Sequence, residues 1–257
     1  MKLSFLFFLL LVTVLSHAQL TVQNGFTAQQ LGSNLAGANI NIINPAITLG
    51  NAGQYGLFNF TGTGLGLSSG VILSSGNINN AIGPNNTPTA TTAYGAPGDP
   101  DLTILANNQT NDAVVLEFEF EVQGDELEFD FVFLCEEYIE HINPATNPYN
   151  DVFAFYISGP GITGQENLAV VPGTNAPVSV QSINSTSFFQ FYVDNNYNPN
   201  APSPVNIQFD GFTVPLKARQ TGLTPCSIYK LSLRVADAGD DTWDAAVMIK
   251  ENSLVSS

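Results

Sequence analysis

The sequence FDFVFLCEEYIEHINPATNPYNDVFAFYISGPG, residues 129–161, contains two apolar stretches separated by an acidic segment rich in Pro and Asn. From Phe129 to Phe133 every second residue is Phe, which predicts a β-strand with one buried face. A second strand is expected to begin just after Asp151. The segment between them has no Lys or Arg and three glutamates, Glu136, Glu137 and Glu140. Crowded carboxylates repel one another, so either water screens them or a cation binds them.

The residues just before this stretch alternate in the same way. Apolar residues between Leu116 and Val122, and again between Leu127 and Phe133, alternate with Glu or Asp, and Gln123-Gly124-Asp125 separates the two runs. We predict a β-hairpin with an aromatic core face and an acidic face. Like charges on paired strands destabilise a sheet, so the acidic face should be solvated or should bind cations. We expect the solvated face.

Further runs of strand length predict an all-β fold. They cover residues 168–171, 178–183, 188–193, 205–214, 228–235 and 246–249. We expect a two-sheet β-sandwich or a jelly-roll-like arrangement with long loops and at most one or two short helices. One helix is predicted over Ala28–Leu35 with Thr27 as its N-cap. Residues 77–110 are expected to form a long loop, in which Asp99 and Asp101 are candidate cation ligands.

Residues 1–18 are typical of a secretory signal peptide. Lys2 precedes an apolar run from Leu3 to Leu15, and the small-residue ending predicts cleavage near Ala18. This run is shorter than the roughly 20 residues that a membrane-spanning helix needs. We therefore expect a secreted or cell-surface protein without membrane insertion after cleavage, in which residues 19–257 form a single domain.

The charge of the chain excludes some classes of partner. It has 22 Asp and Glu residues against six Lys and Arg, and its net charge is −16. After residue 18 all basic residues lie in residues 217–257. Nucleic acids and anionic membrane surfaces need cationic contacts, so neither is an expected partner. We expect an extracellular glycan or protein ligand.

Two cysteines, Cys135 and Cys226, occur in this chain. In an exported protein they could form a disulfide, which would contribute on the order of 4 kcal/mol in the chain-entropy description. The alternative is a pair of free thiols, because the sequence does not place their Cβ atoms within reach of each other.

Two acidic segments supply the oxygen ligands that calcium prefers. The first includes Glu136-Glu137 and Asn150-Asp151, and the second is DAGDDTWD, residues 237–244. We expect a Ca²⁺ site if the two segments converge, and hydrated turns if they do not. The candidate ligands are Glu136, Glu137, Asn150, Asp151, Asp237, Asp240, Asp241 and Asp244.

The sequence does not favour catalysis. A carboxylate pair could serve a glycoside hydrolase, and this carbohydrate-active enzyme is the alternative function, but acids are too abundant here for a pair to be informative. His141 is the only histidine after residue 18, which argues against a nucleophilic triad and against a zinc site. Tyr138 and Trp243 are candidate ligand contacts, because aromatic rings stack on sugars and on protein partners.

Several segments together resemble the choice-of-anchor L domain of secreted proteins from Bacteroidetes. They include GLGLSSGVILSSGNINNAIGPNN, FDFVFLCEEYIE, NDVFAFYISGPGI, IQFDGFTVPLKA and RVADAGDDTWDAAVMIKENSL. The resemblance covers nearly all of residues 19–257. It implies an exported surface or secreted protein, and members often carry type IX secretion segments after this domain. The resemblance assigns no biochemical activity.

One residue departs from the family's pattern. Cys135 stands where members more often have a small Ser or Ala before Glu-Glu-Tyr, so the resemblance implies nothing about its pairing. Taken together, the residues and the resemblance predict a non-catalytic binding or adhesion module that calcium stabilises.

Overall fold

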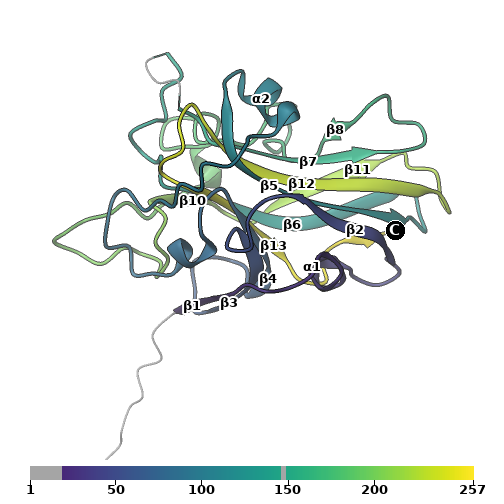
Figure 1. The fold of residues 1–257 in the computed structure, drawn as a ribbon, viewed down its shortest axis with the longest axis horizontal. Coiled ribbons are helices and arrows are strands. Elements are labelled where there is room, and N and C mark those ends of the chain that lie inside the picture. The colour runs from purple at the N-terminus through teal and green to yellow at the C-terminus, as the bar shows by residue number, and fades with distance from the viewer. Residues whose placement is uncertain (1–18, 146–148) are drawn as a thin grey trace, which may run out of the picture.

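The computed structural model describes residues 19–145 and 149–257, and the predicted signal peptide lies outside these residues. Two β-sheets stack face to face, as expected for a β-sandwich (Figure 1). The strands are β1 (Gln19–Gln23), β2 (Ile42–Leu49), β3 (Tyr55–Thr61), β4 (Ser69–Ser74), β5 (Thr110–Glu121), β6 (Glu126–Cys135), β7 (Val152–Ser158), β8 (Glu166–Asn167), β9 (Tyr192–Asp194), β10 (Gly211–Thr213), β11 (Leu216–Thr221), β12 (Ile228–Ala238), β13 (Ala245–Lys250) and β14 (Val255–Ser256).

One sheet has nine strands and the other has five. The larger has the order β1-β3-β4-β13-β6-β10-β9, with β11 and β14 also paired to β6, and the smaller has the order β2-β5-β12-β7-β8. The longest strands, β5, β6 and β12, run through the middle of the sandwich. The predicted all-β sandwich is confirmed.

Phenylalanines from both sheets fill the space between them. Phe133 of β6 stacks on Phe153 of β7 with ring centroids 4.8 Å apart, and Phe131 meets Phe155 edge to face at 4.9 Å. Each fully buried Phe contributes on the order of 1.5–3 kcal/mol by leaving water. Two smaller apolar clusters cover the outer faces of the sheets, and the one on the nine-stranded sheet contains Leu134 and Phe212.

The hairpin prediction for β5 and β6 is wrong. The alternation is present, but β5 pairs with β2 and β12 whereas β6 lies in the other sheet and pairs with β13, β10, β11 and β14. Each strand turns its aromatic residues toward the same core from opposite sides, which buries both sets of rings. A hairpin would have placed them side by side on one sheet.

Most outward carboxylates of β5 and β6 form ion pairs with basic residues from neighbouring strands. Lys217 of β11 lies 2.8 Å from Glu128 and 3.1 Å from Asp130, and Lys230 of β12 lies 2.9 Å from Glu117. Ion pairs thus relieve the repulsion, in place of the purely solvated face that the sequence suggested.

Two α-helices flank the sheets, together with the 3₁₀ turns Ile78–Ala81 and Phe189–Phe191. The helix predicted over Ala28–Leu35 is confirmed as α1: Thr27 Oγ1 accepts from the amide of Gln30, and Gln30 Oε1 accepts from the amide of Thr27. The second helix, α2 (Pro100–Ala106), lies inside the segment predicted as a loop. It covers the outer face of the five-stranded sheet (Figure 1).

Asp99 and Asp101, the candidate cation ligands of this segment, lie at the start of α2 and contact a basic residue. Asp99 Oδ1 caps α2 by accepting from the amides of Asp101 and Leu102, and both carboxylates pair with Arg234. Four other predicted strands are wrong in whole or in part. Residues 168–171 contain only an isolated bridge at Val170, and residues 178–183 are mostly turns and bends. Residues 188–193 are mainly a 3₁₀ turn that leads into β9, and residues 205–214 contain only the short strand β10.

Candidate functional site

Four strand ends of the sandwich meet at one place, and each carries a carboxylate. Glu136 and Glu137 follow β6, Asp151 precedes β7, Asp237 is the penultimate residue of β12, and Asp244 precedes β13. The register brings them together, because Ala236 pairs with Val152 and Ala245 pairs with Cys135. The two acidic segments that the sequence singled out therefore do converge.

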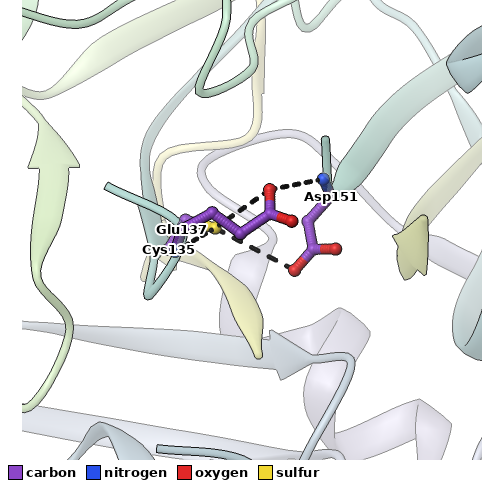
Figure 2. Close-up of side chains that lie close together, drawn as sticks. All are labelled: Cys135, Glu137 and Asp151. Carbon is purple, nitrogen blue, oxygen red and sulfur yellow. Dashed lines mark hydrogen bonds between the residues drawn. The ribbon is translucent and has the colours of Figure 1, made fainter. Parts of the chain in front are cut away.

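We define the inner acidic group as Glu137, Asp151 and Asp237, which lie next to the core between the sheets. Asp151 donates its amide to Glu137 Oε2 at 2.9 Å, and its Oδ1 accepts from the amide of Ala238 at 3.0 Å. Cys135 Sγ lies 4.0 Å from Glu137 Oε2 and 3.9 Å from Asp151 Oδ2 (Figure 2). Less than a twentieth of each side chain in the inner acidic group is exposed.

Asp237 is the least satisfied member of the inner acidic group. Neither of its carboxylate oxygens has a hydrogen-bond partner, although the residue is fully buried. The nearby Ser75 hydroxyl is engaged with the backbone carbonyl of Ala245, at 3.3 Å. A buried carboxylate left in this state is costly unless it is protonated or meets a cation.

No basic side chain of the described residues reaches this group. The five basic residues after residue 18 all form ion pairs with other carboxylates. Burial, followed by repulsion from the neighbouring acids, raises the pKa of Asp151 well above its ordinary value, and burial also raises the pKa of Asp237. For Glu137, burial raises the pKa to about 8. Each shift opposes a bare negative charge and would be reversed by a bound cation.

The other predicted ligands fall into different places. Asp244 is well satisfied, since it accepts from Asn80 Nδ2, Thr91 Oγ1 and the amide of Thr92. The side-chain oxygen of Asn150 is buried without a partner, and Asp240 lies beside Glu137 at the surface. Asp241 is half-buried in the loop between β12 and β13. Glu136 lies on the opposite side of β6 from Glu137.

Sequence reasoning missed two buried acids, Asp112 and Asp210. Asp112 accepts from the amides of Tyr94 and Ala96, at 2.6 and 2.5 Å, and so holds the long segment before β5 in place. Asp210 lies between Phe209 and Gly211 and is fully buried. The available signal was an Asp directly beside an apolar residue, Ala113 for Asp112 and Phe209 for Asp210, since such an acid can be buried with its neighbour.

A small pocket opens beside the inner acidic group. It has a volume of about 210 Å³ and is lined by Glu137, His141, Tyr149, Asp240, Thr242 and Trp243. The His141 ring meets Trp243 at 4.8 Å and Tyr149 at 5.3 Å, both edge to face. Trp243 has a φ of 65°, a left-handed conformation that is unusual for a bulky residue and is found at functional sites. The pocket combines aromatic rings with two carboxylates.

Tyr138, the other predicted ligand contact, is fully buried. Its hydroxyl donates to the carbonyl of Ile183 at 2.9 Å, and its ring packs on Tyr192. Its role in this structure is to pack under the loops, so the surface contact expected for it is not supported.

The disulfide that the sequence allowed is contradicted. Both cysteines are free, Cys135 buried and Cys226 exposed. Cys135 ends the ten-residue strand β6, whereas the amide of Cys226 donates to Val122, just before β6 begins. The two thiols therefore lie at opposite ends of the sandwich, and the alternative of two free thiols holds.

The fold and site define a strand-rich module with acidic loops gathered at one end. The chain belongs to the choice-of-anchor L domain family, whose model matches residues 20–255. No curated protein and no solved structure matches it. The family is not a known enzyme family, and its description indicates a surface-associated, extracellular module. Within residues 19–145 and 149–257, no helix is long and apolar enough to cross a membrane.

Proposed function

We propose that this protein is a non-catalytic extracellular binding or adhesion module, and that calcium stabilises its ligand-binding end. The observation that carries the proposal is Asp237, fully buried with two partnerless oxygens next to Asp151 and Glu137. Calcium prefers clusters of hard oxygen atoms from carboxylates and backbone carbonyls. Glu137 belongs both to the inner acidic group and to the pocket, so an ion bound there would also order the pocket.

The pocket is the proposed ligand site. Trp243, Tyr149 and His141 offer ring faces and edges, and Glu137 and Asp240 offer hydrogen-bond acceptors. A sugar ring or an exposed side chain of a protein partner suits a site of this size and composition. The net charge of −16 favours neutral or cationic ligands over anionic ones.

Thermal unfolding with calcium and with chelator tests the metal part of the proposal. A hundredfold excess of calcium over Kd adds about 2.7 kcal/mol, which corresponds to a rise in Tm of about 5–10 °C for a protein of this size. Asp237→Asn should reduce this rise without lowering the Tm of the metal-free protein, because it replaces a buried, partnerless carboxyl group with a neutral amide of the same shape. The matched control is Asp125→Asn, the same change at an exposed position at the other end of β6. Equal Tm values for the wild type in calcium and in chelator would refute calcium binding.

Trp243 provides a direct reading of the pocket, because it is the only Trp in the chain. We expect its emission to change when an oligosaccharide or peptide from a broad panel binds, and Tyr149→Ala to weaken that binding about tenfold or more, the effect of losing roughly 1.4 kcal/mol. Turnover of a panel compound by the wild type, lost in Glu137→Gln, would overturn the non-catalytic assignment and favour the carbohydrate-active enzyme.

A further inference from the structure

A second row of carboxylates lies on the other side of β6. Gly211 and Ala245 both pair with Cys135, from β10 and β13 respectively, so Asp210 and Asp244 flank Glu136 on its two sides. Residues opposite each other on antiparallel strands have Cβ atoms about 4.5–5.5 Å apart. All three side chains are fully buried.

Alternation along β6 places this row away from the inner acidic group. Cys135 belongs to the core between the sheets, whereas Leu134 and Phe212 belong to the cluster on the outer face of the nine-stranded sheet. Successive side chains of a strand point to opposite faces. Glu136 and Asp210 therefore lie on the outer face, with the sheet between them and the core.

The hydrogen bonds of this row are unevenly distributed. Asp210 Oδ1 accepts from Asn85 Nδ2 at 2.6 Å and from the amide of Tyr197 at 2.9 Å, but Asp210 Oδ2 and both carboxylate oxygens of Glu136 have no partner. The Gln208 side chain and the Ala90 backbone lie near enough to Glu136 to favour its charged form, but neither makes a hydrogen bond of good geometry with its carboxylate. The Gln208 side-chain nitrogen donates instead to Asn85 Oδ1 and to the carbonyl of Thr87. Three buried oxygens from two facing carboxylates are thus left without a donor.

The electrostatics agree with this geometry. Burial, and then repulsion from Asp210, raises the pKa of Glu136 to about 9, and burial raises the pKa of Asp210 to about 6. The basic residues of the described chain are ion-paired elsewhere. Two facing carboxylates in such surroundings either retain a proton or share a cation.

We propose that Glu136 and Asp210 form a second binding site for a hard divalent cation, Ca²⁺ or Mg²⁺, on the outer face of the nine-stranded sheet. One 2+ ion balances the two carboxylates, and their three partnerless oxygens supply its first ligands. Oxygen-only ligation suits both ions, and Mg²⁺ in particular is bound through one or two carboxylates with water completing its shell. The site does not depend on calcium binding by the inner acidic group.

Calorimetric titration of chelator-stripped protein, residues 19–257, with CaCl₂ and separately with MgCl₂ counts the ions. We expect two ions per chain in the wild type with at least one of the metals, and one ion fewer in Glu136→Gln and in Asp210→Asn. Asp237→Asn should lose the other ion, and Glu140→Gln, an exposed control on the same loop, should lose none. Unchanged stoichiometry in Glu136→Gln and Asp210→Asn would overturn the second site.

Wild-type crystals soaked in MnCl₂ give a test that does not depend on folded variants. An anomalous peak between Glu136 and Asp210 supports the second site. A peak at the inner acidic group alone overturns the second site and leaves the proposed function standing. A peak between Glu136 and Asp210 alone supports the second site and refutes calcium binding by the inner acidic group. No peak at either place would indicate shared protons and would refute both sites.

Discussion

At the scale of single residues, the sequence identifies the inner acidic group but does not separate it from the outer row. Glu137, Asp151 and Asp237 were predicted as ligands because they occur in acidic segments without Lys or Arg. Adjacent residues such as Glu136 and Glu137 look equivalent in a sequence. Their side chains point to opposite faces of the sheet because both residues continue the alternation of the strand that precedes them, β6. The partner of Glu136, Asp210, comes from a distant segment with no acidic cluster of its own.

Arg234 shows how a buried charge can be compensated within the same fold. Its guanidinium lies 2.9 Å from Asp99 and 2.7 Å from Asp101, with Glu117 at 3.6 Å and the Tyr156 ring 5.3 Å away. We expect Arg234→Ala to lower the free energy of unfolding by about 3–5 kcal/mol, because it leaves Asp99 buried without its counter-ion. Urea denaturation measures the change.

The matched control for that prediction is Arg219→Ala. Arg219 also pairs with a carboxylate, Glu126, but its side chain is 56% exposed. Exposed pairs contribute little, so the urea midpoint of this variant should stay close to that of the wild type. Similar losses in the two variants would mean that the burial of Arg234 does not matter.

At the scale of elements, alternation predicted β5 and β6 correctly but not their pairing. Period-2 patterning states which residues share a face and is silent about the sheet to which a strand belongs. The turn at residues 123–125 is compatible with a tight hairpin and also with a connection between stacked sheets. Pairing is settled by strands far along the chain, since β12 and β13 occupy the edges that a hairpin would have used.

The helix α2 was missed because residues 77–110 are polar on average. Its signals were present locally, with Asp99 as N-cap, Pro100 at the first helical position and a short run of apolar residues. We expect Leu102→Ala to cost about 2–5 kcal/mol, because Leu102 is fully buried against β5, β7 and β12. Ile104→Ala in the same helix should change stability by less than about 0.5 kcal/mol, since Ile104 is 78% exposed. Urea unfolding of both variants checks the packing of α2, and equal effects would contradict it.

At the scale of the whole molecule, positive and negative charges are separated. Basic residues lie on the outer faces of the strands, where they pair with Glu and Asp of β5 and β6 or with the acids at the start of α2. The end that carries the inner acidic group and the outer row has no such compensation among the described residues. The net charge of the chain is −16, and buried carboxylates without a basic partner lie at the loops of this end. These loops should therefore attract cations.

This separation distinguishes bound calcium from calcium that only screens the surface. In 1 M NaCl the Debye length falls to about 3 Å, which removes most attraction between exposed charges, while buried groups are screened much less. We predict that the increase in Tm given by calcium over chelator keeps roughly half or more of its size in 1 M NaCl, because the proposed ligands are buried. Asp125→Asn should behave like the wild type, and Asp237→Asn should show a smaller increase at both salt concentrations. If the increase vanished in 1 M NaCl, calcium would be acting as a counter-ion of the acidic surface, and the partnerless oxygens of Asp237 and Glu136 would have to be satisfied by protons.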